Sequence, residues 1–559
     1  MTLDAFFESY YRLRPVNATY TGVHDHDDRL PDWSPEGLDA AADEMRSLRR
    51  DLARAPAAHP AASDDERTFA RVDRAIADAF LEIQIAETES GHFARGNPSL
   101  WAGEALFSVL SLMTRDFAPA GERIEAAAAR LAAIPGFLAS AARTIGSPAP
   151  ADWVRRARRE CEGAAILFGP GVDTWLDRAR ASDALASLAR RHADSARRAF
   201  EAFDTWLAAL PPAPPERYAC GAEMLDLLLA RGHWCTRSRA ELLADVRERL
   251  DDALARHDEM ARATAPGGWP EVQERLAVQH PRATDYYAAY GRVWEACRCE
   301  AEARELVTWI EHPIRYVPIP PETRDAAPYL YYLFYRSPAP FDRPAVHEYA
   351  VTPVEADMPA SERERRLRAN NDSVIKLNHV VHHGALGHHV QNAHARRSTS
   401  RIGQVAAVDC ASRIGMFCGG TLAEGWACYA TDLMEESGFL TELERVAEQH
   451  ARARQLARAV VDLSLHAGEM TLDECTALYT DRVGMPAPAA RAEAVKNSMF
   501  PGAAVMYWLG TQGIHDLRAE RRAAEGERFT NRVFHDGVLR YGAIPVPLIA
   551  RLVRGETLA

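Results

Sequence analysis

One short segment carries an unusual density of histidine. Residues 371–397, NDSVIKLNHVVHHGALGHHVQNAHARR, hold six of the 20 histidines in this chain of 559 residues. They are His379, His382, His383, His388, His389 and His394. Imidazole is the commonest metal ligand in proteins and the side chain best suited to moving protons near neutral pH. Packing alone does not explain this density, so the segment is predicted to be the centre of a metal site.

The spacing of the histidines leaves more than one ligand pair open. A zinc-like ion needs its ligand atoms about 2 Å away, so the ligand residues must converge. On a regular helix His379 and His383 lie on one face, because they are four residues apart. His382 and His389 are about two turns apart, a rise of roughly 10 Å, which is too far on a straight helix.

A break in the helix would allow a different pair. Gly384 and Gly387 could interrupt the helix and bring His382 and His388 together. A third ligand must then come from another segment, and Glu424 is the natural choice, because it follows a Gly-Gly hinge and begins EGWACY on a predicted helix. Catalytic zinc commonly takes two histidines and one carboxylate and keeps a position open for water.

The histidine segment is the first of five short motifs that follow one another along residues 374–552. They are HHGALGHHVQ, AEGWACYA, RAVVDLSLH, FPGAAVMYWLG and FHDGVLRYGAIP. In this order they resemble the motifs HEAxPGHHxQ, EGWAxYAE, RxxVDxxxH, PGQAxxYxxG and FHDxxLxxGxxP of the DUF885 family, helical proteins grouped with zinc metallopeptidases. The helical N-terminal half is compatible in length with the family.

The resemblance implies a ligand set. It implies His382 and His388 as metal ligands and Glu424 as the third, while the spacing keeps His379 and His389 as alternatives. The ion that it implies is a single divalent metal, expected to be zinc.

The resemblance also implies roles close to the reaction for two further residues. His466 and Tyr507 match the family's histidine and tyrosine in the third and fourth motifs. The sequence alone is equally compatible with a histidine satisfied in the core and with a tyrosine that only packs.

The chain departs from the family pattern at the catalytic glutamate. His383 stands where the family has the glutamate that follows the first ligand. In the peptidase mechanism that carboxylate takes a proton from water and passes it to the leaving amine. Imidazole can act as a base, since its ordinary pKa is about 6.5, but a nearby divalent cation disfavours its protonated form. His383 is therefore a candidate base or a further ligand, together with His379.

Three further departures surround the site. Leu386 replaces the family's proline, which alters the local backbone, and Thr431 stands where the family has a second acid. Lys496 and Asn497 replace an arginine–tyrosine pair. A lysine keeps the charge that could bind a substrate carboxylate but loses the bidentate geometry of arginine, so Lys496 is the candidate substrate-binding residue.

These residues favour a metal-dependent hydrolase that acts on an amide or peptide-like bond of a small substrate. The metal would polarise the carbonyl and activate water, His383 or His466 would relay protons, and Tyr507 would donate to the oxyanion. Two alternatives stay open. One is a non-peptidase metal-dependent biosynthetic enzyme, because a histidine-rich shell also suits iron or copper. The other is a catalytically inactive, peptidase-like binding protein, because the standard base is missing.

Helices must position these residues. Residues 1 to about 315 read as helix after helix, as in Asp64–Glu89, where apolar residues recur at helical spacing behind an acidic first turn. The sequence predicts a mainly α protein, a large helical metallopeptidase-like fold with a small β hairpin near the active-site cleft. The hairpin is expected within residues 314–359, where IRYVPIPP and VHEYAVTPV flank YLYYLFYRSPAPFD.

The change of character near residue 315 suggests two regions. Residues 1–315 form an N-terminal helical region and residues 316–559 a C-terminal metal-site region, both expected to belong to one continuous DUF885-like unit. The aromatic side chains of the segment between the two strands could wall a substrate cleft or simply fill the core. They are Tyr329, Tyr331, Tyr332, Phe334 and Tyr335.

Composition narrows the partners and the compartment. The net charge of −13 argues against nucleic acid, because phosphate binding needs a basic face. No apolar run reads as long enough to span a bilayer, and the first residues lack the pattern of a signal peptide. Nine scattered cysteines without a CxxC pair suit a reducing compartment. We expect a cytoplasmic protein with a small-molecule or short peptide-like substrate and neither nucleic acid nor membrane as a partner.

Overall fold

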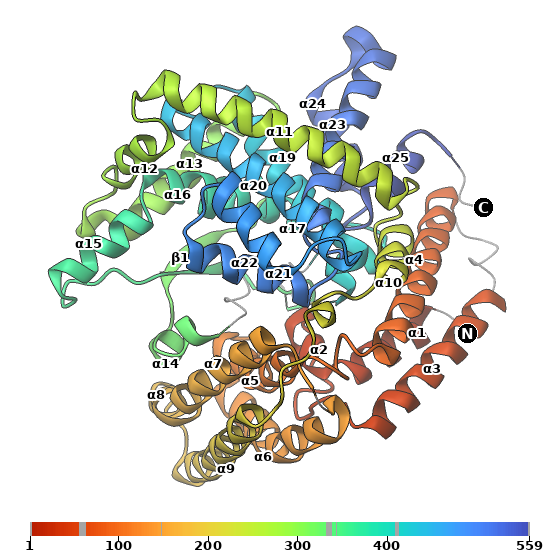
Figure 1. Cartoon of the computed structure of the whole chain (residues 1–559), viewed down its shortest axis with the longest axis vertical. Coiled ribbons are helices and arrows are strands. Elements are labelled where there is room, and N and C mark those ends of the chain that lie inside the picture. The colour runs from red at the N-terminus through yellow and green to blue at the C-terminus, as the bar shows by residue number, and fades with distance from the viewer. Residues whose placement is uncertain are drawn as a thin grey trace. The chain divides into compact units, whose positions relative to one another are not determined.

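The computed structural model describes residues 3–54, 63–146, 148–330, 338–342, 344–407 and 413–556. The fold is mainly α with one small two-stranded sheet, which confirms the predicted fold class (Figure 1). The chain forms two compact units. The first comprises Met1–Cys220, Ile319–Tyr335 and Ala339–Pro344, and the second comprises Gly221–Pro318, Arg336–Pro338 and Ala345–Ala559. The expected division at residue 315 stays a prediction.

The first unit is built from helices, and several of them share one apolar core. Its helices are α1 (Leu3–Leu13), α2 (Pro15–Thr21), α3 (Pro35–Arg54), α4 (Asp64–Glu89), α5 (Pro98–Thr114), α6 (Ala120–Ile145), α7 (Ala151–Ile166), α8 (Val172–Arg178), α9 (Asp183–Ala208) and the later α14 (Pro321–Arg324), with shorter turns at Leu167–Gly171, Pro215–Tyr218 and Ala327–Tyr329. The core lies mainly between α5, α6, α7 and α9, and it includes Ala326 and Leu330 from the later segment. Tyr329 is described here, whereas the other four aromatic residues of its predicted cluster lie outside the described residues.

A fully buried arginine on α6 is hydrogen-bonded to α2, to α5 and to the loop that follows α2. The guanidinium of Arg130 is 0% exposed, and its nitrogens donate to the backbone oxygens of Ser108 at 2.7 Å and Arg29 at 3.0 Å and to the hydroxyl of Thr19 at 2.8 Å. A buried guanidinium is tolerated only when its donors are satisfied. Arg130 therefore links three segments that are distant in sequence.

Helix α6 tests the expectation about membrane-spanning runs. By length and composition α6 is apolar enough to cross a bilayer, so the expectation that no run is long enough was wrong for this helix. Half of its most apolar window is buried inside the structure, and its apolar face forms part of the shared core. Core helices of this kind pass the same test of length and composition.

The second unit contains the histidine segment. Its helices are α10 (Ala222–Leu227), α11 (Arg239–Thr264), α12 (Trp269–Ala277), α13 (Tyr286–Ala303), α15 (Ala360–Ala369), α16 (Asp372–Val374), α17 (His388–Ala395), α18 (Arg401–Val405), α19 (Gly420–Glu436), α20 (Glu442–His466), α21 (Leu472–Ala477), α22 (Ala487–Met499), α23 (Val505–Glu525), α24 (Asn531–Leu539) and α25 (Val546–Val553). Between them lie short 3₁₀ turns and the wider π-helical turns Leu228–Gly232, Ile375–Gly384, Gly415–Gly419 and Leu478–Arg482.

Four long helices pack as two pairs in this unit. Helix α11 packs along α20, and α19 packs along α23 (Figure 1). Helices α19 and α23 approach closely because glycines face each other. A Cβ atom on Gly425 would lie 2.5 Å from the backbone of Gly510, and one on Gly510 would lie 1.8 Å from the carbonyl oxygen of Thr421. This close contact fixes the position of α19, the helix that carries Glu424.

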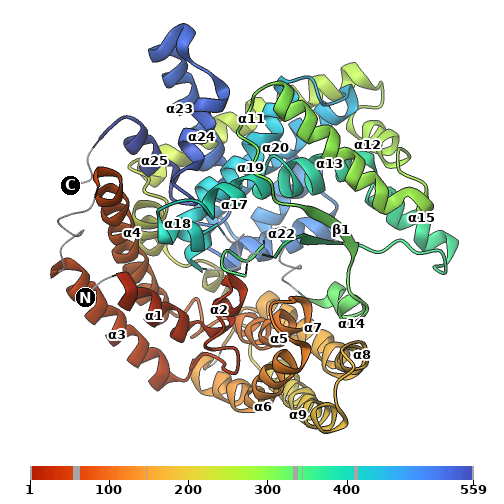
Figure 2. The same cartoon turned by 180° about the vertical axis from the view of Figure 1, so that it is seen from behind.

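The two strands pair in parallel, which corrects the predicted hairpin. Strand β1 (Ile314–Pro318) pairs with β2 (His347–Val351), with Ile314 opposite His347 and Pro318 opposite Val351. A hairpin needs antiparallel strands and a short turn, whereas residues 319–346 separate these strands and include α14. The two strands were located correctly. Their relative direction depends on the path of the connection between them, which the local sequence does not specify. Strand β1 lies beside α13 (Figure 2).

Candidate metal centre

The histidine segment begins as a wide helical turn. The side chain of Asn371 accepts a hydrogen bond from the backbone N–H of Val374 at 3.1 Å and so caps α16. The chain then continues as a π-helical turn, η6 (Ile375–Gly384). Such turns are rare and occur often at functional sites, because the extra residue per turn changes where side chains point. Here the change affects His379, His382 and His383.

The helix breaks where the glycines stand. Ala385 has φ −132° and ψ −108°, Gly387 has φ −73° and ψ −119°, and α17 begins at His388. A Cβ atom on Gly387 would lie 1.9 Å from the carbonyl oxygen of His382. Only glycine allows the chain to fold back this closely. The break therefore brings the start of α17 beside the end of η6.

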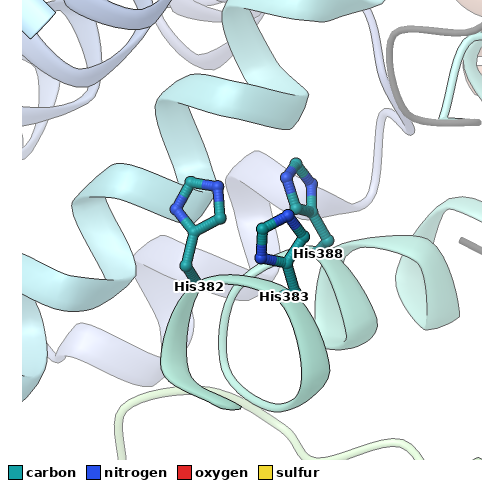
Figure 3. A group of neighbouring side chains, drawn as sticks. All are labelled: His382, His383 and His388. Carbon is teal, nitrogen blue, oxygen red and sulfur yellow. The ribbon is translucent and has the colours of Figure 1, made fainter. Parts of the chain in front are cut away.

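Three imidazoles converge across this break. His382 and His383 come from the last turn of η6 and His388 from the first turn of α17, and each offers a ring nitrogen within 4.8 Å of the others (Figure 3). The ring centroids of His382 and His383 are 4.6 Å apart, and that of His388 lies 4.9 Å from the first and 5.3 Å from the second. This group of three histidines could hold a metal ion.

Glu424 reaches the same group from α19. Its Oε2 atom lies 3.5 Å from Nε2 of His382 and 3.5 Å from Nε2 of His388, and the residue is only 3% exposed. Burial alone would raise the pKa of the Glu424 carboxyl, but His388 and His382 hold that pKa well below its ordinary value. The carboxylate is therefore ionised in the interior.

The separations suit a shared cation. Two ligand atoms about 2.1 Å from one ion lie roughly 3.4 Å apart at the tetrahedral angle, close to both 3.5 Å distances between imidazole and carboxylate. A direct hydrogen bond between a charged nitrogen and a carboxylate is shorter, about 2.7–2.9 Å. The donor set of imidazoles and one carboxylate fits a divalent ion of the zinc type.

A backbone contact orients His383. Its Nδ1 lies 2.7 Å from the carbonyl oxygen of Asn378. A carbonyl can only accept, so Nδ1 carries the proton and, in the neutral ring, Nε2 carries the lone pair. Histidines that bind metals commonly donate their other ring N–H in this way. The same arrangement also suits a base.

Two tryptophans hold the segment that joins the histidines. The indole Nε1 of Trp294 on α13 donates to the carbonyl oxygen of Gly384 at 2.7 Å, and that of Trp426 on α19 donates to the carbonyl oxygen of Leu386 at 2.9 Å. Trp426 is 0% exposed and follows Glu424 by two residues. One helix therefore supplies both the carboxylate and a donor that fixes the break.

The alternative ligands have other contacts. Nδ1 of His379 lies 3.1 Å from the hydroxyl of Tyr349 on β2. Nε2 of His389 lies 2.6 Å from the carbonyl oxygen of His312, and burial and His312 lower the pKa of His389 to about 3. Neither belongs to the converging group found among the described residues. The strands therefore brace η6 through His379.

The structure places His466 at the end of α20, away from solvent. It is 0% exposed, its Nε2 donates to the carbonyl oxygen of Asn497 at 3.0 Å, and burial lowers its pKa to about 4. One turn earlier, the carboxylate of Asp462 accepts backbone hydrogen bonds from Gly502, Ala504 and Val505 at 2.9–3.0 Å. These contacts hold the end of α22 and the start of α23.

Tyr507 and Lys496 lie on the helices that these contacts hold. Tyr507 is half-buried on α23, with the guanidinium of Arg458 5.4 Å from its ring centroid. Lys496 is exposed near the end of α22.

Sequence reasoning missed the role of Trp294, which belongs to no motif. Trp426 lies inside EGWACY and could have been noticed as a large residue close to a predicted ligand.

Fold and site together define a mainly helical protein with a histidine group that could hold a metal ion. The chain belongs to the family DUF885, described as "Bacterial protein of unknown function (DUF885)", whose model matches residues 15–553. No curated protein matches the chain.

Two solved structures share the fold. One is a "putative lipoprotein of unknown function" from Shewanella oneidensis, with 20% identity, a TM-score of 0.76, and coverage of 99% of this chain and 98% of that one. The other is a "putative lipoprotein" from Colwellia psychrerythraea, with 16% identity, a TM-score of 0.76 and the same coverage. At these identities the likeness concerns the fold alone.

Proposed function

We propose that this protein is a metal-dependent hydrolase that cleaves an amide or peptide-like bond of a small substrate. The observation that supports the proposal most is the pair of equal 3.5 Å distances that join Oε2 of Glu424 to His382 and His388. Two histidines and a carboxylate are a common donor set for catalytic zinc. His382, His388 and Glu424 would hold the ion, which we propose to be zinc. When bound, such an ion polarises a carbonyl and makes water a stronger nucleophile near neutral pH.

His383 would act as the base in place of the family's glutamate. Its hydrogen bond to Asn378 leaves the Nε2 lone pair to accept a proton from water and return it to the leaving amine. Tyr507 would donate its hydroxyl proton toward the oxyanion. His466 would act by position, since it holds Asn497 beside Lys496.

Metal content tests the ligand set. Purified protein is expected to contain about one divalent ion per chain by elemental analysis, and Glu424→Gln is expected to lose most of it, because an amide is neutral and a weaker ligand. Glu248→Gln is the matched control, since Glu248 is exposed on α11. Unchanged metal content in Glu424→Gln would contradict the assignment. A redox metal in place of zinc would favour the biosynthetic alternative.

Turnover tests the reaction. A panel of short peptides and N-acyl amides is expected to show metal-dependent hydrolysis that His382→Ala abolishes. The replaced base is the observation that favours a non-catalytic binding protein instead. Two results together would support a non-catalytic binding protein. The wild-type protein would hold its ion and hydrolyse no member of the panel, and His383→Glu, which restores the family residue, would hydrolyse some of them.

We propose a cytoplasmic location and neither nucleic acid nor membrane as a partner. The acidic net charge of −13 supports the absence of nucleic acid. The scattered cysteines support a reducing compartment. The two proteins of similar fold are described as lipoproteins, which favours the cell envelope for them. Fractionation of cells with an antibody to this chain would decide between the two locations.

A further inference from the structure

Helices α20 and α22 gather three cations around one carboxylate. Arg458 donates from Nε and Nη2 to the two oxygens of Glu493 at 2.7 and 3.0 Å. Arg454 stands one turn before Arg458 on α20, and Lys496 stands one turn after Glu493 on α22. Burial alone would raise the pKa of Glu493, but Arg458, Lys496 and Arg454 hold it at about 2. The carboxylate is thus fully ionised and is committed to Arg458.

Arg454 is the cation that this arrangement leaves over. Within the part of the chain that the structure describes, no side chain or backbone group forms an ion pair or hydrogen bond with it, and its Nε is buried. Burial lowers the pKa of Arg454 and the charge of Arg458 lowers it further, while Glu493 and Glu448 act in the opposite sense. A partly buried guanidinium is costly unless an anion satisfies it.

The second nearby acid does not supply this anion. Burial raises the pKa of Glu448 to about 7, and among the described residues no hydrogen bond or ion pair joins Glu448 to Arg454. Glu448 also accepts a hydrogen bond from the hydroxyl of Thr431 at 2.9 Å. Arg454 and Lys496 together therefore leave an excess of positive charge between α20 and α22.

Helix α20, which carries Arg454, also contacts α19, the helix that carries Glu424. Cys428 follows Glu424 by one turn on α19, and its sulfur accepts a hydrogen bond from Gln455 on α20 at 3.1 Å. The charges of both Glu424 and Arg458 act on the Cys428 thiol. The guanidinium of Arg458 also packs over the ring of Tyr507, the proposed oxyanion donor. Arg454 thus stands one helical turn from the guanidinium that packs over Tyr507.

We propose that Arg454, assisted by Lys496, binds the free carboxylate of the substrate. The planar guanidinium fork matches a carboxylate with two parallel hydrogen bonds. The substrate class is then an N-acyl amino acid or a short peptide with a free C-terminal carboxylate. The link to hydrolysis rests on the proposed function, whereas binding of the carboxylate stands on the contacts of α20 and α22.

The test compares an acid with its neutral amide. N-acetylglycine and N-acetylglycinamide are titrated into the purified holoprotein, and binding is followed by ligand-observed NMR. N-acetylglycine is expected to bind more tightly than the amide, and Arg454→Gln to weaken its binding at least about tenfold, as for the loss of hydrogen bonds to a charged group. Arg445→Gln, at an exposed position of the same helix, removes the same charge and is expected to change little.

Further variants keep the outcomes separate. Arg454→Lys retains the charge but not the fork, and it is expected to bind N-acetylglycine several-fold more weakly even if Arg454→Gln does not fold. Equal binding of acid and amide by the wild-type protein, or unchanged binding in both Arg454 variants, would overturn the subsite. Two variants separate the carboxylate subsite from the metal centre. If Glu424→Gln loses the metal but still binds N-acetylglycine, the subsite stands without the metal centre. If Arg454→Gln keeps the metal but no longer binds N-acetylglycine, the metal centre stands without the subsite.

Discussion

Removing one indole N–H should weaken metal binding without removing a ligand. In Trp426→Phe the carbonyl oxygen of Leu386 loses its donor at 2.9 Å, and both residues are 0% exposed. A buried polar group left without its partner costs about 1–3 kcal/mol. In the metal-free variant the segment that holds Leu386 can relax and avoid this cost. Binding of the ion requires His388 to lie near His382, so the cost then reduces the free energy of metal binding.

The magnitude follows from that cost. At about 1.4 kcal/mol per tenfold, the range corresponds to roughly 5- to 150-fold weaker binding of the ion, and losses of supporting contacts around metal ligands are typically about 10- to 100-fold. Trp508→Phe is the matched control. The Nε1 of Trp508 is buried and has no hydrogen-bond partner among the described residues, so the same trimming of the ring removes no bond.

Competition with a chromogenic zinc chelator measures the affinity of each variant. Far-ultraviolet circular dichroism of the metal-free proteins shows whether either variant is unfolded. If Trp426→Phe and Trp508→Phe bind zinc with equal affinity, the hydrogen bond to Leu386 does not position the histidines, and the reasoning fails.

Three further variants test other parts of the structure. Gly387→Ala should abolish metal binding, because its Cβ would lie 1.9 Å from the carbonyl oxygen of His382, whereas Gly136→Ala meets no atom within 4 Å and should bind normally in the same chelator assay. Burial opposes the charge on His24, but two aspartates raise its pKa from 6.5 to about 9. The contribution of His24 to stability is therefore complete below pH 6.5 and is lost as the pH rises through 9. Thermal melts across this window should show the melting temperature falling as the pH rises. The same dependence of melting temperature on pH in His24→Gln would contradict this assignment. Arg130→Met should lower the unfolding free energy by roughly 3–5 kcal/mol, as for a broken buried network. Arg50 is exposed, so Arg50→Met should change the midpoint of urea unfolding little. Equal urea midpoints for the two variants would refute the role of Arg130.

The sequence allowed the centre of the site to be predicted because its cause is local. Glycine at 384 and 387 signalled a break, and a break was the condition for His382 and His388 to meet. The π-helical turn before it was not predictable, because its wide hydrogen bonds depend on support from Tyr349 and Trp294, which come from other parts of the chain. Glu424 lies beside two of these histidines, and its role as a ligand stays a prediction.

Pairing and charge were less accessible to prediction. The strands were recognised by their residue types, but their parallel order depends on the long connection of residues 319–346. Arg454 belongs to a helix with several arginines, and its sequence does not distinguish it from them. Arg454 differs from these arginines only in the folded protein, where Glu493 on α22 forms hydrogen bonds with Arg458 and not with Arg454.

That long connection has a consequence for synthesis of the chain. When a ribosome has made the first 220 residues, the segments 319–335 and 339–344 that complete the first unit do not yet exist. Glu322, which pairs with Arg178, and Asp342, which pairs with His24, arrive together with Ala326 and Leu330 of the core. A fragment ending at Cys220 should therefore emerge with an unfilled interior, and the first unit should reach its final packing only after β1 has left the exit tunnel.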